Sequence, residues 1–76
     1  MALLERITSH PDVCHGKPCV RGLRYPVELL LDLLAAGETP QEIVAEYPDL
    51  ETDDLRAVLA YAARAVRTKR VVPFAA

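Results

Sequence analysis

The strongest hydrophobic pattern of the chain lies in residues 26–37. Apolar residues recur there at the i, i+3, i+4, i+7 spacing that places them on one face of a helix. Pro26 near the first helical position and Gly37 after the last turn match the usual ends of a helix. A second apolar edge lies beside the first face, so this helix should contact more than one neighbour. The first face contains Val27, Leu30, Leu31 and Leu34, and the second edge contains Leu29, Leu33 and Ala36.

Two more helices are predicted after this segment. Thr39, Pro40 and Glu42 form a complete capping box, which predicts a short helix that ends near residues 47–48. A third helix is predicted from about Thr52, because apolar residues again recur on one stripe. Its acidic first turn and its basic end agree with the helix dipole. The stripe contains Leu55, Val58, Leu59, Ala62 and Val66, the acidic turn contains Asp53 and Asp54, and the basic end contains Arg64, Arg67, Lys69 and Arg70.

The N-terminal third should be extended rather than helical. Pro18 and Pro26 disfavour helix at the residues that precede them. Two short segments, "RIT" at 6–8 and "CVR" at 19–21, are predicted to pair and to fold an arm across the helices. The predicted fold is one mostly α domain, a three-helix, helix-turn-helix-like core with a short N-terminal β arm or hairpin. Its predicted parts are the arm at 1–25, the core at 26–69 and a tail at 70–76.

Composition points to a small cytoplasmic protein that associates. Hydrophobic residues make up 51% of the 76 residues, with one Phe and no Trp, so Leu, Val and Ala should form the core. A chain this short buries only about 60% of its unfolded surface, and association hides surplus apolar surface. We therefore expect a homodimer through Leu29, Leu33 and Ala36. No signal peptide or membrane-spanning run is recognisable, so we expect a cytoplasmic location and cysteines that stay as thiols.

The charges are segregated along the chain. Residues 25–55 contain nine acidic residues and no Lys or Arg, whereas the remainder carries a net charge of +7. Segregation of this kind concerns partners more than fold.

The segment "CHGKPCVRGLRYPV", residues 14–27, is the densest in chemically active side chains. His10, Cys14, His15 and Cys19 are possible zinc ligands, but the C-x₂-C spacing of zinc motifs is absent. One buried thiol, one exposed thiol and two surface histidines are the favoured interpretation. Lys17 precedes a proline, which cannot donate to phosphate, so a phosphate loop is rejected. We expect no catalytic residue, cofactor or metal, because nothing orients a Cys–His pair and so small a domain has little room for a cleft.

Nucleic acid and protein partners both fit the basic residues. The predicted second and third helices are acidic where a reading helix would meet phosphates, so DNA contact would have to come from the arm. The basic side chains that could touch DNA are Lys17, Arg21 and Arg24 on the arm, and Arg56 one turn into the third helix. The C-terminal segment "RAVRTKRVVPFAA" is either a solvated helix end with a frayed tail or an extended segment that docks on an acidic partner.

Residues 6–63 resemble the small prokaryotic domain-of-unknown-function 433 family. The resemblance is carried by "GKPCVRG", "YPV", "LLAAG", "EIVAEYPDL" and a third helix that ends in "YAA". It implies structural roles for Cys14 and Cys19, which match the family's "CGGKPC" stretch, with His15 in place of a glycine. Many members look like VapB-type antitoxins of type II toxin–antitoxin systems, whose partner is a PIN-like ribonuclease.

The resemblance thus implies an antitoxin that inhibits such a toxin and regulates its own operon by binding DNA. A PIN-like nuclease collects carboxylates around Mg²⁺, and an arginine can pair bidentately with such carboxylates. The predicted toxin-binding residues are Arg64, Arg67, Lys69, Arg70, Val71, Val72 and Phe74. The alternatives are a stand-alone helix-turn-helix regulator that binds DNA through the arm, and a metal-sensing module that would purify with stoichiometric zinc.

Overall fold

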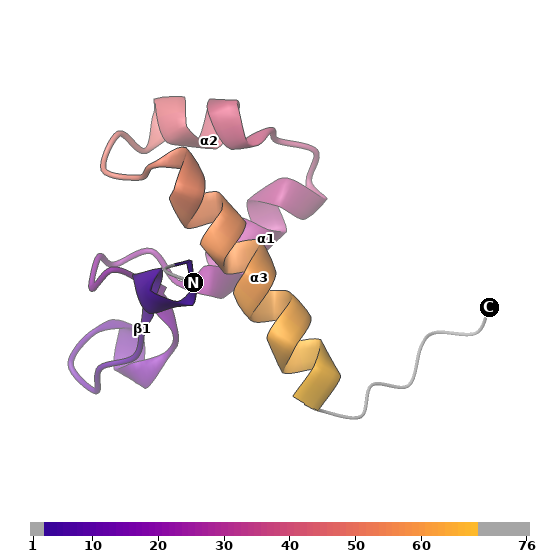
Figure 1. Cartoon of the computed structure of the whole chain (residues 1–76). Helices are drawn as coiled ribbons and strands as arrows, with labels where there is room; N and C mark the ends of the chain where they lie inside the picture. The colour runs from indigo at the N-terminus through magenta and orange to yellow at the C-terminus, as the bar shows by residue number, and fades with distance from the viewer. Residues whose placement is uncertain (1–2, 69–76) are drawn as a thin grey trace.

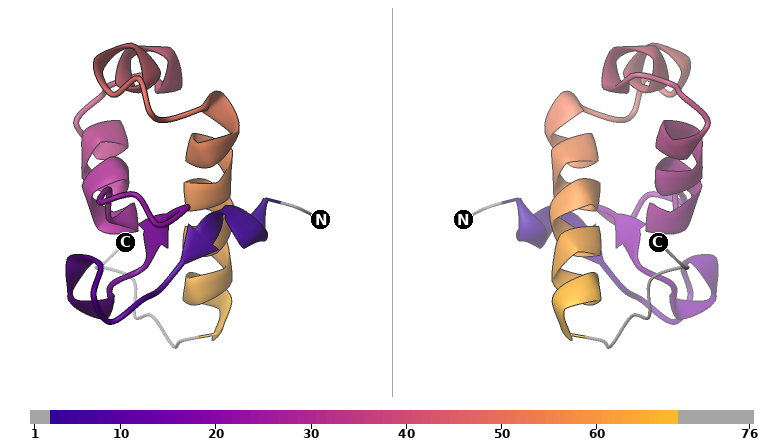
Figure 2. Two further views of the ribbon diagram at one scale, coloured as in Figure 1. Left: turned by 90° about the vertical axis from the view of Figure 1, so that its left-hand side faces the viewer. Right: turned by 90° about the vertical axis from the view of Figure 1, so that its right-hand side faces the viewer.

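A computed structural model describes residues 3–68 of the chain. Three helices form the body: α1 (Val27–Ala35), α2 (Pro40–Glu46) and α3 (Thr52–Thr68). Ahead of them come two single 3-10 turns, η1 (Leu4–Arg6) and η2 (Cys14–Gly16), and two strands, β1 (Ile7–Thr8) and β2 (Cys19–Val20). The helices α1 and α3 lie side by side, α2 lies across one end of the pair, and the strands lie toward the other end (Figures 1 and 2). The predicted mostly α fold with an N-terminal β hairpin is confirmed.

The two segments that were predicted to pair form a hairpin. They are antiparallel, with Ile7 opposite Val20 and Thr8 opposite Cys19. Just beyond the strands, the amide of Arg21 donates to the carbonyl of Arg6 over 2.7 Å. The pairing therefore places two arginines next to each other at one end of the hairpin.

The loop between the strands makes a left-handed turn. Cys14, His15 and Gly16 have φ values of 51°, 56° and 82°. Only glycine adopts this region without steric cost, so two side-chain-bearing residues are held here in a strained backbone. The Ser9 hydroxyl donates to the Gly16 carbonyl over 2.6 Å and ties the turn back to the end of β1.

The second helix begins with the predicted capping box. The Glu42 amide donates to the Thr39 hydroxyl over 3.2 Å, and the Thr39 amide donates to the Glu42 carboxylate over 2.8 Å. These hydrogen bonds lower the pKa of Glu42, with the backbone bond from Thr39 as the main cause. The helix ends at Glu46, and the ring of Tyr47, the next residue, meets that of Tyr25 edge-on.

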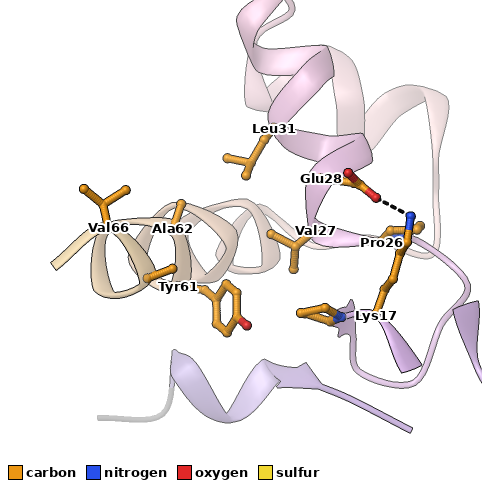
Figure 3. A pocket seen from close by; sticks show the side chains of 10 residues that line it. Lys17, Pro26, Val27, Glu28, Leu31, Tyr61, Ala62 and Val66 are labelled. Carbon is orange, nitrogen blue, oxygen red and sulfur yellow. Dashed lines mark hydrogen bonds and ion pairs between the residues drawn. The ribbon is translucent and has the colours of Figure 1, made fainter. Parts of the chain in front are cut away.

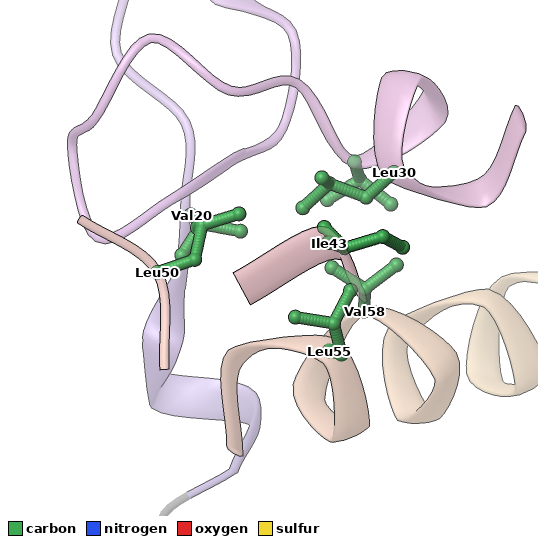
Figure 4. Close-up of a cluster of buried hydrophobic side chains, with 7 residues drawn as sticks. Val20, Leu30, Ile43, Leu50, Leu55 and Val58 are labelled. Carbon is green, nitrogen blue, oxygen red and sulfur yellow. The ribbon is translucent and has the colours of Figure 1, made fainter. Parts of the chain in front are cut away.

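The hydrophobic core lies where the three helices and the hairpin converge (Figure 4). Every helix contributes at least one buried side chain, and β2 contributes Val20. The buried cluster consists of Val20, Val27, Leu30, Ile43, Leu50, Leu55 and Val58. Aliphatic side chains therefore fill the core, as the composition predicts.

The predicted apolar stripe of α3 is only partly buried. Leu55 and Val58 are in the core, but Leu59 and Val66 are 49% and 58% exposed. Leu59 is exposed although Val58 beside it is buried and Tyr61 beyond it is half-buried, so its exposure follows from the face of α3 on which it lies. Val66 lies near the end of α3, which has 17 residues whereas α1 has nine and α2 has seven. At 1.5 Å per residue, α3 extends past its neighbours, so the later part of its stripe has less to pack against. None of the helices within residues 3–68 is both long and apolar enough to span a membrane.

Candidate functional site

Asp54, in the first turn of α3, is the only fully buried charged side chain in the described part of the chain. Its carboxylate accepts from Arg21 through Nε at 3.0 Å and Nη2 at 2.8 Å, a two-pronged contact. Arg6 Nη1 donates to the same carboxylate over 2.9 Å, and the amide of Glu51 donates over 2.8 Å. The hairpin places both arginines beside the Asp54 carboxylate, so the cluster holds the N-terminal arm against the start of α3.

The electrostatics of this cluster favour the charged forms. Burial alone would raise the pKa of the Asp54 carboxyl, but the hydrogen bonds from Arg21, the Glu51 amide and Arg6 lower it further than burial raises it. The pKa of Arg21 is raised by Asp54, and that of Arg6 is raised by Glu51 and then by Asp54. Arg6 also contacts the Glu51 carboxylate over 2.7 Å. The cluster is therefore a set of ionised groups that compensate one another.

Because of this cluster, the free energy of unfolding should depend on pH in the acid range. Because the folded-state pKa of Asp54 is lowered, its contribution is present above the ordinary carboxyl value of 3.8 and is lost as pH falls through the folded pKa. Urea unfolding from about pH 5 down to about pH 2 should show a steeper loss of stability for the native chain than for Asp54→Asn. Equal slopes for the two proteins would show that Asp54 is not held charged by its partners.

The predicted DNA-contact role of Arg21 is not supported by this geometry. Its guanidinium donates to Asp54 and, through Nη2, to the carbonyl of Asp49 over 2.8 Å. The prediction treated Asp53 and Asp54 alike, as a surface that repels DNA, but only Asp53 is exposed. A sequence signal existed, because Asp54 is the third residue of α3 and can reach back to the amide before the helix. The pairing with Arg21, 33 positions away, has no such local signal.

The other predicted DNA-contact residues lie on the surface. Lys17 Nζ contacts Glu28 over 2.7 Å, which raises the pKa of Lys17. Arg56 contacts Asp53 over 3.2 Å, one turn away on α3. Exposed pairs of this kind are weak and can exchange for a phosphate. Arg24 is exposed beside Arg21 in a shallow hollow and forms no ion pair with a carboxylate of residues 3–68.

The cysteines and histidines do not gather into a metal site. Within residues 3–68, no three His, Cys, Asp or Glu side chains could hold an ion together. Cys19 is buried and donates to the Lys17 carbonyl, and burial raises the pKa of its thiol to about 11. Cys14 is half-buried, His10 and His15 are exposed, and both cysteines are free thiols. The favoured interpretation is confirmed except that Cys14 is less exposed than predicted.

The predicted toxin-binding residues fall into two groups. Arg64 and Arg67 are exposed on the last two turns of α3. Arg67 forms no ion pair with a carboxylate in the described part of the chain. The others lie outside the described residues: Lys69, Arg70, Val71, Val72 and Phe74.

Part of the predicted dimer edge of α1 already packs against other residues of this chain. Leu33 packs against the core cluster and Leu29 is half-buried, whereas Ala36 is exposed just beyond the helix. A homodimer through this edge stays a prediction.

An apolar groove opens between the start of α1 and the second half of α3 (Figure 3). Its volume is about 500 Å³. Val27 and Leu31 of α1 face Tyr61 and Ala62 of α3 across it, and the Lys17–Glu28 ion pair lies at its rim. The sequence pattern does not predict this groove, because its walls come from three segments that are separate in the sequence.

A family model described as "Protein of unknown function (DUF433)" matches residues 7–62, which is most of the chain. The chain belongs to the DUF433 family. The predicted resemblance is therefore confirmed, over nearly the residues on which it rested.

A relative and a solved structure extend this assignment. An uncharacterized protein of Sinorhizobium fredii, y4eO, is 36% identical over 72 residues, which cover 93% of this chain and 33% of the relative. The chain thus spans about a third of that protein's length. A crystal structure of a DUF433 member from Anabaena variabilis superposes with a TM-score of 0.76 at 32% identity and covers 83% of this chain and 62% of that one. The fold of this DUF433 domain is accordingly shared with a protein whose structure has been solved.

Proposed function

We propose that this DUF433 protein is the antitoxin of a type II toxin–antitoxin pair and inhibits a PIN-like ribonuclease. The observation that carries the proposal is that exposed basic side chains gather at the end of α3. Arg6 and Arg21 are bound to Asp54, and Lys17 and Arg56 have acidic partners. The end of α3 projects past the core (Figure 1). Arg64 and Arg67 are exposed on its last two turns.

The chemistry of such a partner matches this end of the helix. A PIN-like nuclease holds Mg²⁺ with a cluster of carboxylates, and an arginine pairs with a carboxylate through two parallel hydrogen bonds. Arg64 and Arg67, followed in the sequence by Lys69 and Arg70, would occupy the place of the metal. The apolar residues Val71, Val72 and Phe74 would anchor the segment on the nuclease surface.

DNA binding and dimerisation complete the proposal. Operator DNA would be contacted by Lys17 and Arg24 of the arm and by Arg56 of α3, whereas Arg21 is bound to Asp54. A homodimer through Leu29, Leu33 and Ala36 would place two such arms on one operator.

The test is inhibition of the nuclease encoded beside this gene. The native chain, titrated into that nuclease, should abolish cleavage of a fluorogenic RNA near one-to-one stoichiometry. Arg64→Glu combined with Arg67→Glu should raise the concentration for half-inhibition more than about 100-fold, because hydrogen bonds to charged groups contribute about 1.5–3 kcal/mol each. Arg56→Glu is the matched control, since it reverses another exposed arginine of α3 and should inhibit like the native chain.

No inhibition by the native chain would reject the antitoxin role. Equal inhibition by the double variant would reject Arg64 and Arg67 as the residues that inhibit the nuclease. If the chain also binds its own promoter with steep salt dependence, the stand-alone regulator becomes the better proposal. The exposed Arg24, which has no carboxylate partner in the described residues, is the observation that favours this second candidate.

A further inference from the structure

The apolar groove between α1 and α3 is an unfilled continuation of the hydrophobic core. Val27 belongs both to the buried cluster and to the wall of the groove. Beyond it the two helices diverge (Figure 3), and the space between them is an open groove. The wall is almost wholly apolar, formed by Pro18, Pro26, Val27, Leu31, Tyr61, Ala62, Ala65 and Val66. An exposed apolar groove of this size on so small a domain indicates a site that binds another segment or molecule.

We propose that residues 71–74 of this same chain, Val-Val-Pro-Phe, dock in the groove. They include the only phenylalanine of the chain, and they follow α3 directly in the sequence, separated from Thr68 by Lys69 and Arg70. Three apolar side chains in four residues need cover from water, and the groove offers an apolar surface next to where they begin.

The length of the segment and the position of the end of α3 are compatible with this docking. The part of α3 that lines the groove runs from Tyr61 to Val66, close to the end of the helix at Thr68. That part is about 8 Å long at the helical rise. The six residues that follow Thr68, up to Phe74, span up to about 20 Å when extended. A reversal after α3 therefore brings Phe74 back along the whole groove.

Charge is complementary at the same place. Glu28, which pairs with Lys17, lies at the rim of the groove, and Asp32 lies one turn further along the same side of α1. Both are exposed, and the two residues that lead into the docked segment are Lys69 and Arg70. The basic pair would lie against the acidic flank of α1 while the apolar residues enter the groove.

This docking is independent of the proposed function but has a consequence for it. A segment that covers the groove in the unbound protein would have to leave it to bind a toxin. The groove would then cover the apolar residues of the segment until a toxin displaces them from it.

The test uses Phe74→Trp in the full chain, which otherwise contains no tryptophan. The emission maximum of this tryptophan should be blue-shifted, and acrylamide should quench it several-fold less than a free tryptophan derivative. Val66→Glu, placed in the same protein, should restore solvent-like emission, because it puts a charge on the wall of the groove. Leu59→Glu is the matched control, since Leu59 is similarly exposed on α3 but does not line the groove, and it should leave the emission shifted.

Circular dichroism should show all three proteins folded, since both substituted side chains are exposed. Solvent-like emission in the Phe74→Trp protein, or emission that Val66→Glu does not change, would overturn the proposal. A blue shift that is lost on dilution would assign the segment to the groove of a second copy and would likewise overturn docking within one chain. In the native chain, nuclear Overhauser effects between the Phe74 ring and the Leu31 methyl groups should be present, and their absence would count against the proposal. None of these measurements needs a toxin, so their failure leaves the antitoxin test unaffected.

Discussion

Replacing Asp54 by alanine should lower the free energy of unfolding by about 3 kcal/mol, near the low end for the loss of one partner of a buried ion pair. The substitution leaves Arg6 and Arg21 facing each other with no buried carboxylate between them. Their side chains are 26% and 35% exposed, so water can reach them in part, which places the expected loss near the low end. The amide of Glu51 also loses its hydrogen-bond acceptor.

This loss would be large for a domain of 76 residues, whose total stability is of the order of 4–11 kcal/mol. Urea unfolding followed by circular dichroism measures it directly. Asp53→Ala is the control, because Asp53 is the neighbouring residue but is exposed, and its loss should cost less than about 0.5 kcal/mol. If the two substitutions cost the same, the cluster does not fasten the arm in the way proposed.

Replacing Ile43 by alanine should cost about 3 kcal/mol, the middle of the range for large aliphatic core residues. Ile43 is fully buried and is the one buried residue in α2. It lies in the centre of the core, between Leu30 of α1 and Val58 of α3 (Figure 4). Its truncation therefore leaves a cavity at the junction of all three helices.

The same substitution should loosen α2 more than the rest of the body. Hydrogen exchange should accelerate in residues 40–46 beyond the global change measured in α3, because α2 is short and has one buried anchor. Val44→Ala is the control, since Val44 is half-buried beside it and should cost less. A cost below about 1 kcal/mol for Ile43→Ala would contradict the role of Ile43 as the anchor.

Internal pairing changes how the charge of this protein should be understood. Along the sequence, the cations of the arm and those of the C-terminus look equivalent. In the fold, Arg6 and Arg21 hold the arm on α3, whereas the exposed arginines at the end of α3 lie away from the Asp54 cluster. The arginines that an acidic partner could contact are therefore those at the end of α3 and, on the hairpin, Arg24.

The sequence by itself determined the local structure of this protein. The capping box at Thr39 and Glu42 is visible because its partners are three residues apart. The pairing of residues 6–8 with residues 19–21 follows from two short extended segments that are joined by turn-forming residues. The three helices follow from periodicity, and family membership follows from motifs that are contiguous in the chain.

Tertiary structure decided which of these residues are available for function. Periodicity assigns Leu59 and Val66 to an apolar stripe, but only the fold shows that both side chains are left largely exposed. Composition gives Arg21 and Asp54 a charge, but their contact joins positions 33 residues apart. Burial and ion pairing depend on which distant segments meet, and a pattern along the chain specifies faces and ends of elements without specifying their neighbours.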